Sequence, residues 1–154
     1  MSRSIVCGVD GSADSEAALA TAARLCERLD LRLVVAHVAE PIHVPYAAAA
    51  PFGGMAGPDA VVSEASTQEA EAERLLEQVV AKAGLVDARR RASVGQPAER
   101  LADLADDEDA ELIVVGSRGR GAFKAAFLGS VSNSLVGVAR CPVLIVPRGA
   151  REEP

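Results

Sequence analysis

The sequence predicts a single α/β domain, built on a five-stranded, doubly wound parallel sheet with helices on both faces. Its length of 154 residues suits one domain, and 49% of the residues are hydrophobic, which is enough for a sizeable core. Short runs rich in Val, Ile and Leu alternate with longer segments whose apolar residues recur at helical spacing. Because right-handed crossovers between parallel strands place helices on both sides of a sheet, this alternation favours the doubly wound arrangement.

Two buried strands and the helix between them are predicted near the start of the chain. The runs "SIVCGVD" at 4–10 and "LRLVVAHV" at 31–38 are β-branched and apolar, as is typical of strands covered on both faces. Ser12 is the expected N-cap of the helix that joins them. The apolar positions of that helix are Ala18, Ala22, Leu25 and Leu29.

A long irregular connection is expected after the second strand. Residues 41–58 are rich in Pro, Gly and Ala, and such a loop is either functional or disordered. The apolar spacing then predicts a helix from about Asp59 to Ala83. Ser66 and Glu69 have the spacing of a capping box within it.

The second half of the chain continues the alternation of strands and helices. In order, we expect a less buried strand in 86–95, a helix opened by Pro97, an apolar strand at 111–116, a helix at 130–138 and a final strand in 141–148. The polar segment 149–154 is expected to be a tail. The predicted domain therefore spans residues 1–148.

Composition and charge narrow the classes of partner. The net charge of −6 and the isoelectric point near 4.9 argue against a nucleic acid or an anionic membrane as the main partner. The chain shows no secretory signal sequence and no apolar run long enough to span a membrane. The three cysteines have no metal-ligand spacing and lie in apolar surroundings, so they are expected to be reduced and buried. These features predict a cytoplasmic protein.

The charge is unevenly distributed along the chain. Residues 112–151 contain no acidic residue but six bases, which are Arg118, Arg120, Lys124, Arg140, Arg148 and Arg151. This basic region coincides with a glycine-rich segment, "GSRGRGAFKAAFLGS" at 116–130. A small, highly charged anion bound there would explain the coincidence, although a solvated basic face would give the same count.

The glycine-rich segment does not match two familiar phosphate loops. Gly116 and Gly121 have the gap of a Walker A loop, but Ala and Phe follow where Lys and Ser or Thr are needed. Gly119 and Gly121 begin a GxGxxG pattern, but Lys124 replaces its third glycine. A P-loop NTPase is therefore excluded, and a dinucleotide site is not expected.

A different pattern remains, Gly116-x2-Gly119-x9-Gly129-Ser130. Its glycines permit close approach of the backbone and positive φ, and the amides of the following helix N-terminus point at anionic oxygens. Ser130 and Ser132 add hydroxyl donors. A simple turn is the alternative interpretation of the same glycines.

These residues also carry a family resemblance. The long-gapped glycine motif, "VDGS" after the first strand and "CPVLIV" at the last together resemble the nucleotide-binding branch of the universal stress protein family, across essentially the whole chain. The resemblance implies a Rossmann-like fold of the adenine nucleotide alpha hydrolase type. It also implies a stress-responsive protein that binds ATP, with Mg²⁺, and that forms a homodimer through the final strand, Val143 to Val146.

The resemblance assigns site residues. It implies that Val9 and Asp10 line the adenine and ribose end and that Val38 contacts the base. The residues implied to hold the ribose and phosphates are Gly116, Ser117, Gly119, Gly129, Ser130, Val131 and Ser132. Apart from the resemblance, one of the bases Arg118, Arg120 or Lys124 is expected to face the phosphates. A carboxylate at the end of a buried strand can accept hydrogen bonds from a ribose, although Asp10 could instead interact with a helix dipole.

Three functions remain open from the sequence. The first is a binding module in which ATP shifts the dimer or the 41–58 loop into a state that partners recognise, with at most slow hydrolysis. The second is an ATPase or a nucleotide-dependent transferase in which Asp10 or His37 positions the attacking group. The third is a binder of cyclic AMP or AMP in the same cleft. His37 can also be a packed residue or a purine-stacking wall.

Overall fold

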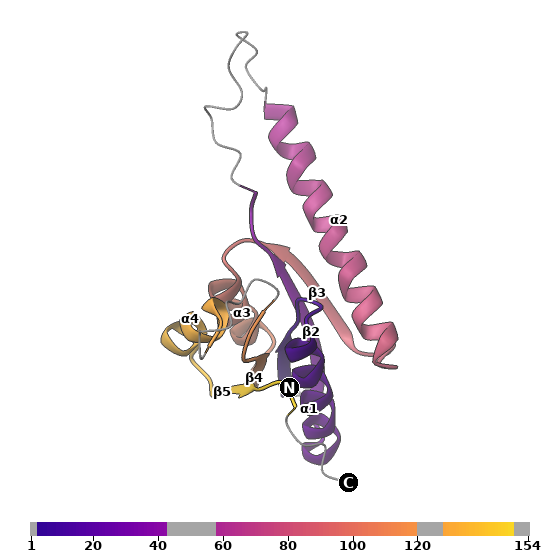
Figure 1. Cartoon of the computed structure of the whole chain (residues 1–154), viewed down its shortest axis with the longest axis vertical. Coiled ribbons are helices and arrows are strands. Elements are labelled where there is room, and N and C mark those ends of the chain that lie inside the picture. Colours follow the sequence, from indigo (N-terminus) through magenta and orange to yellow (C-terminus); the bar gives the residue numbers. More distant parts are fainter. Residues whose placement is uncertain (1–2, 43–57, 120–127, 150–154) are drawn as a thin grey trace.

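A computed structural model describes residues 3–42, 58–119 and 128–149, and the side chains of α2 from residue 66 onward (Figure 1). The strands are β1 (Ser4–Gly8), β2 (Arg32–Ala39), β3 (Arg89–Val94), β4 (Ala110–Gly116) and β5 (Val143–Val146). The helices are α1 (Ala13–Leu29), α2 (Pro58–Lys82), α3 (Pro97–Asp107) and α4 (Ser130–Val138). Strands and helices alternate as the sequence predicts. Most of the 41–58 loop and the end of the 149–154 tail lie outside the described residues.

The five strands form one parallel sheet in the order β3-β2-β1-β4-β5. The predicted fold class is therefore confirmed. The chain moves outward from β1 to β2 and β3, and then returns to the other side of β1 with β4 and β5. The order reverses between β1 and β4, and in open parallel sheets ligands bind outside the carboxyl ends of the strands at such a reversal.

Each face of the sheet buries its own core. On one face α1 packs over β1, β4 and β5, and α2 packs over β2 and β3. On the other face α3 packs over β1, β2 and β4, and α4 packs against α3 and β5. Successive strand residues alternate between the two cores, so Cys7 belongs to the first and Val6 to the second.

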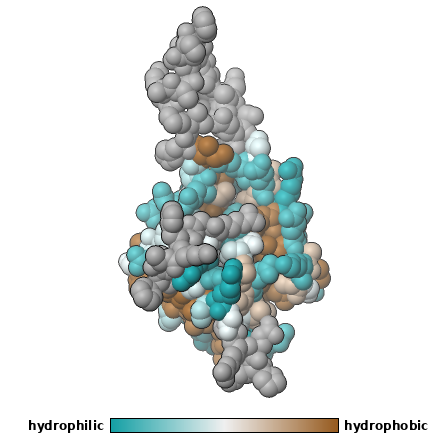
Figure 2. All heavy atoms as spheres, viewed as in Figure 1, coloured by the Kyte–Doolittle hydropathy of each residue, from teal (hydrophilic) through white to brown (hydrophobic). Residues whose placement is uncertain are grey.

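The long helix α2 extends past the end of the sheet in Figure 1. Among its residues 66–82, whose side chains are described, the buried ones are Ala72, Leu76, Val79 and Val80. Its outward positions include Glu71, Glu73 and Arg74, and the described surface there is mostly hydrophilic (Figure 2). Burial of the apolar stripe 72–80 therefore fixes this helix on β2 and β3.

The predicted helix starts have mixed outcomes. Ser12 caps α1, because its hydroxyl accepts a hydrogen bond from the Ser15 amide at 3.2 Å. Pro97 occupies the first turn of α3, as expected. The predicted capping box at Ser66 and Glu69 is wrong, because α2 already begins at Pro58 and both residues lie inside it.

The cysteines have no disulfide partner, and two of them are core residues. Cys7 and Cys26 are buried in the same core, while Cys141 is half-buried. Burial raises the pKa of the Cys7 thiol, and it raises that of Cys26 to about 11 with a smaller contribution from the charge of Glu27. Among the described residues, no helix combines the length and apolarity needed to cross a membrane.

A buried carboxylate joins the end of α3 to the start of the sheet. Glu108 follows α3 and is only 6% exposed, and its side chain pairs with Arg91 at 2.8 Å, Arg89 at 3.2 Å and Arg32 at 3.8 Å. Its backbone carbonyl accepts a hydrogen bond from the Ser4 hydroxyl at 2.8 Å. These contacts connect the edge strand β3, β2 and β1 to one helix end.

The Glu108 cluster is expected to stabilise the fold measurably. Glu108→Gln should lower the free energy of unfolding by about 1–2 kcal/mol, because three half-exposed guanidinium groups lose their shared counter-charge. The control is Glu111→Gln, whose carboxylate is 40% exposed and pairs with Arg3, with an expected loss below about 0.5 kcal/mol. Denaturant unfolding measures both, and equal losses would show that the cluster adds nothing beyond an ordinary surface pair.

Candidate functional site

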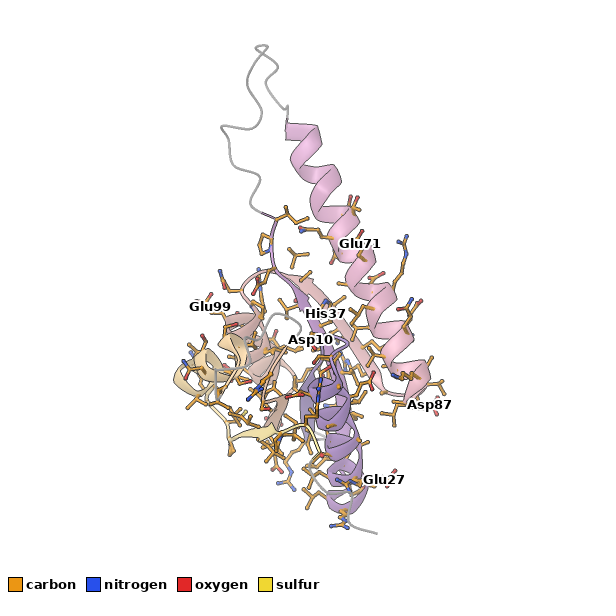
Figure 3. All side chains as sticks on the ribbon, viewed as in Figure 1. Asp10, Glu27, His37, Glu71, Asp87 and Glu99 are labelled. Carbon is orange, nitrogen blue, oxygen red and sulfur yellow. The ribbon has the colours of Figure 1, made fainter. Side chains whose placement is uncertain are left out.

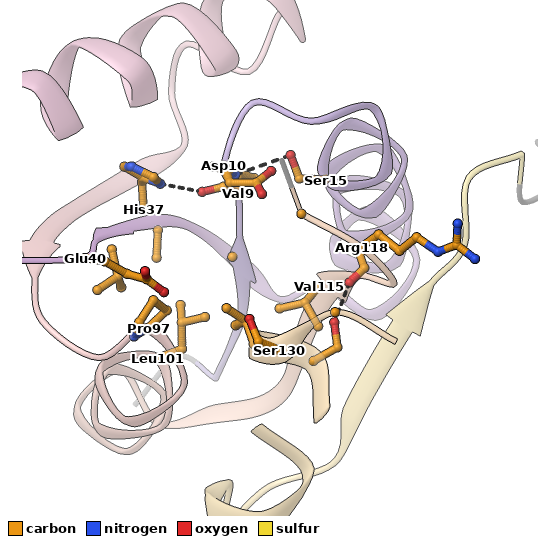
Figure 4. A pocket seen from close by; sticks show the side chains of 18 of the residues that line it. Val9, Asp10, Ser15, His37, Glu40, Pro97, Leu101, Val115, Arg118 and Ser130 are labelled. Carbon is orange, nitrogen blue, oxygen red and sulfur yellow. Dashed lines mark hydrogen bonds between the residues drawn. The ribbon is translucent and has the colours of Figure 1, made fainter. Parts of the chain in front are cut away.

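A cavity lies where the strand order reverses. It has a volume of about 580 Å³ and opens at the carboxyl ends of β1, β2 and β4 (Figure 4). This volume falls within the range of about 300–1,000 Å³ that is usual for small-molecule sites. The cavity is bordered by the end of β1, the end of β2, the start of α3, the loop after β4 and the start of α4.

The structure brings together nearly all of the site residues predicted from the sequence. Those that line the cavity are Val9, Asp10, Val38, Gly116, Arg118, Gly119, Gly129, Ser130, Val131 and Ser132. Ser117 does not line it, because its hydroxyl points to α1 and donates to the Asp14 carboxylate at 2.7 Å. Ser117 therefore contributes to the site by holding the loop after β4 against α1.

Two of the three motif glycines, Gly116 and Gly119, lie where a side chain would meet neighbouring atoms. A Cβ on Gly116 would lie 2.7 Å from the backbone carbon of Asp14, and a Cβ on Gly119 would lie 2.6 Å from Oδ2 of Asp10. Gly129 has a φ of −69°, and the expected positive φ is found at none of these three glycines. The left-handed glycine near the cavity is Gly11, in the turn between β1 and α1, with a φ of 79°.

The start of α4 forms the polar end of the cavity. Gly129 is its N-cap and has no side chain to occupy the first amides of the helix, which have no partner within it. The Gly129 amide donates to the Ser117 carbonyl at 2.7 Å, and the Ser132 hydroxyl donates to the Gly116 carbonyl at 2.7 Å. We expected the Ser132 hydroxyl to donate to an anion. Its proton is instead bonded to the Gly116 carbonyl, so it does not have that role. The exposed Ser130 keeps that role open.

The opposite end of the cavity is mainly apolar. Val38, Pro97 and Leu101 line it, together with the carboxylate of Glu40 (Figure 4). Sequence reasoning missed Glu40, although it follows β2 just as Asp10 follows β1, and that position could have identified it. A flat apolar ligand group fits this end better than a phosphate does.

Asp10 and His37 both line the cavity, and Figure 3 shows their labels close together in the middle of the molecule. The Asp10 carboxylate accepts a hydrogen bond from the Ser12 amide at 2.9 Å. Nδ1 of His37 lies 2.7 Å from the Val9 carbonyl, and because a carbonyl can only accept, Nδ1 carries the proton of this bond. His37 is therefore oriented by the backbone of β1.

Asp14 is the site residue that sequence reasoning missed most clearly. It lies in the first turn of α1 and is 5% exposed. Its Oδ2 accepts hydrogen bonds from the Ser117 hydroxyl at 2.7 Å and the Arg118 amide at 3.2 Å, and its Oδ1 lies 3.3 Å from Nε of Arg148. No local pattern reveals this role, because its partners lie more than 100 residues away along the chain.

The basic region divides between the site and other partners. Arg118 borders the cavity, but its guanidinium points away from it (Figure 4), unlike the sequence-based expectation. Arg140 pairs with Asp106 at 2.9 Å, and Arg148 pairs with Asp14. Arg120, Lys124 and Arg151 lie outside the described residues. The part of the chain that is described contains no group of three or more His, Cys, Asp or Glu side chains arranged to hold a metal ion.

The fold and the cleft define a class of protein: a doubly wound α/β domain with a glycine-lined cavity at the reversal of strand order. Within this class, the chain belongs to the universal stress protein family, whose family model matches residues 1–147. A universal stress protein of Thermus aquaticus, encoded in the QAH/OAS sulfhydrylase 3′ region, is 35% identical over 147 residues. The match covers 95% of this chain and 99% of that protein.

Two solved structures are also similar. A hypothetical protein, MJ0577, matches with a TM-score of 0.75 and 23% identity, covering all of this chain and 99% of that one, and supports the fold. A universal stress protein solved in complex with cAMP matches with a TM-score of 0.66 and 25% identity, covering 95% of this chain and 97% of that one.

The glycines should differ in their tolerance of a side chain. Gly116→Ala is expected to lower the free energy of unfolding by about 1–3 kcal/mol, because its Cβ meets the Asp14 backbone at 2.7 Å. Gly129→Ala should cost less than about 1 kcal/mol, since its Cβ would have no neighbour closer than 3.4 Å. Denaturant unfolding of the two variants makes the comparison, and an equal cost would mean that the loop relaxes around Gly116.

Proposed function

We propose that this chain binds ATP, with Mg²⁺, and acts as a nucleotide-dependent regulator in a stress response. The observation that carries the proposal is the polarity of the cavity, which has helix amides and glycines at one end and an apolar wall at the other. A nucleotide has the same polarity, with phosphates at one end and a flat base at the other. The related structure solved with cAMP supports a nucleotide ligand in this family.

The proposed pose follows the lining of the cavity. The adenine lies against Val9 and Val38, with Leu101 beneath it, and Asp10 accepts hydrogen bonds from the ribose. The phosphates lie against the residues of the glycine motif and the first turn of α4, which are Gly116, Arg118, Gly119, Gly129, Ser130, Val131 and Ser132, while Ser117 shapes the loop behind them. Mg²⁺ would be held mainly by the phosphates and water.

We propose binding rather than turnover as the main activity, with at most slow hydrolysis. Efficient phosphoryl transfer requires placed metal ligands, a group that positions water and a group that stabilises charge. The Arg118 guanidinium is directed away from the cavity in Figure 4, and the bond from Nδ1 of His37 to the Val9 carbonyl leaves Nε2 as the ring nitrogen that could accept a proton. Competition between labelled ATP and cAMP separates ATP from the second candidate ligand, which the cAMP-bound relative favours.

Nucleotide binding is tested in two ways: by identifying the nucleotide that the freshly purified protein releases on denaturation, and by calorimetry. We expect stoichiometric ATP on denaturation, or a calorimetric response to ATP with Mg²⁺. Gly129→Glu should weaken binding more than about tenfold, because it places a carboxylate at the phosphate end. Gly129→Ala is the matched control and should retain binding, since a Cβ there has room. An empty protein that gives no response to ATP or cAMP would contradict the proposal.

We also propose that the protein forms a homodimer through β5. This strand is an edge of the sheet, and its residues Val143–Val146 are all apolar. The carbonyls of Pro142 and Val146 accept hydrogen bonds from the amides of Ile113 in β4 and Ser117 just after it. Because backbone groups alternate along a strand, Val143 and Ile145 direct theirs to the free edge, where a second chain can pair.

The dimer is tested by removing one edge donor. Ile145→Pro eliminates an amide that faces away from β4, so sedimentation should change from dimer to monomer while the fold persists. Ala92→Pro is the matched control on β3, the other edge: the Gly95 amide donates to β2, so the Ala92 amide faces outward. It should leave the dimer intact. A folded Ile145→Pro protein that remains dimeric would place the interface elsewhere.

A further inference from the structure

The glycine loop already holds an anionic group that belongs to the chain itself. The Ser117 hydroxyl and the Arg118 amide are donors of the kind that such loops offer to phosphates. Here both donate to Oδ2 of Asp14, at 2.7 Å and 3.2 Å. Asp14 therefore lies behind the loop as a resident carboxylate, one hydrogen bond away from Arg118, which lines the cavity.

The chain also supplies a counter-charge for this carboxylate. Nε of Arg148, two residues beyond β5, lies 3.3 Å from Oδ1 of Asp14. The two partners differ in their surroundings, since the Asp14 side chain is 7% exposed and that of Arg148 is 75% exposed. Water screens the guanidinium more than the carboxylate, so Arg148 offsets only part of the negative charge behind the loop.

We propose that Asp14, with Arg148 as its counter-charge, sets how much phosphate charge the cavity accepts. Asp14 acts as a positioning and specificity-determining residue: its hydrogen bonds fix the loop, and its charge penalises each added phosphate. This inference rests on the proposed function, because it concerns the phosphate end of a nucleotide bound in this cavity.

The physical reason is that Coulomb repulsion scales with the charge of the ligand. Near neutral pH, ATP carries about four negative charges, AMP about two and cAMP about one, whereas the adenosine moiety is nearly the same in all three. A change in the charge behind the loop must therefore alter the affinity for ATP more than that for cAMP. A change in loop shape alone has no reason to follow the ligand's charge.

The experiment compares the affinities of the full chain and its variants for ATP, AMP and cAMP. Asp14→Asn keeps an oxygen acceptor for the loop and removes the charge, so it should shift the ratio of ATP to cAMP affinity about three- to tenfold toward ATP. Arg148→Met should shift the same ratio about threefold toward cAMP. In the double variant the two shifts should largely offset one another, because the two substitutions change the charge behind the loop in opposite directions.

Two controls separate local charge from other effects. Arg140→Met also removes one positive charge, but from an exposed pair with Asp106, so it should leave the affinity ratio unchanged. Raising the salt from about 0.05 M to about 0.5 M should shrink the shift caused by Arg148→Met. The Arg148 side chain is mostly exposed, so Arg148→Met should fold. The Arg148→Met variant therefore tests the proposal even where Asp14→Asn fails to fold.

The outcomes distinguish this inference from the proposed function. Variants that change the affinity for ATP, AMP and cAMP by the same factor would overturn the charge role of Asp14 while leaving nucleotide binding intact. A wild-type protein that binds none of the three would overturn both. A graded shift, largest for ATP and smallest for cAMP, would support both.

Discussion

The reversal of strand order beside β1 is the constraint on which the rest of this structure depends. The chain lays β2 and β3 on one side of β1 and β4 and β5 on the other, so no crossover connection closes the space between the carboxyl ends of β1 and β4. The first turn of α1 and the loop after β4 must therefore meet directly. They do so at Gly116, which lies so close to the Asp14 backbone that a methyl group would not fit.

The contact between Gly116 and Asp14 determines how the polar end of the cavity is built. The Asp14 carboxylate accepts hydrogen bonds from Ser117 and Arg118 and so holds the loop in place. The carbonyls of Ser117 and Gly116 in turn accept hydrogen bonds from the Gly129 amide and the Ser132 hydroxyl. These bonds place the first amides of α4 at the cavity. Most of the polar bonds near the site are thus internal ones that hold backbone in place. A ligand would meet a surface that is already formed.

The fold was predictable because its signals are local. Apolar strands buried on both faces, a serine before α1 and a proline at the start of α3 each act within a few residues. The capping box failed because Ser66 and Glu69 have the right spacing inside a helix that had already begun. A short motif specifies a helix start only where the preceding residues are not helical.

The sequence indicated which residues gather at the cavity, but not the hydrogen bonds and ion pairs that they make. Nearly all of the residues that the glycine motif and the family resemblance single out line one cavity, because the ends of parallel strands meet at one edge of a sheet. The direction of the Ser132 hydroxyl, the pairing of Arg148 and the role of Asp14 depend on contacts between segments far apart in the chain. No spacing within the sequence encodes such contacts.

The two edges of the sheet are built differently, and this bears on how such a chain can assemble without aggregating. At β3, arginines gathered around Glu108 place charge along the edge strand, while β5 is short and apolar. Open-ended growth of strands into a fibre requires two receptive edges on every molecule. In the proposed dimer, the β5 edge would take up one neighbour and the charged β3 edge would offer no further site for extension, so that association would be self-terminating.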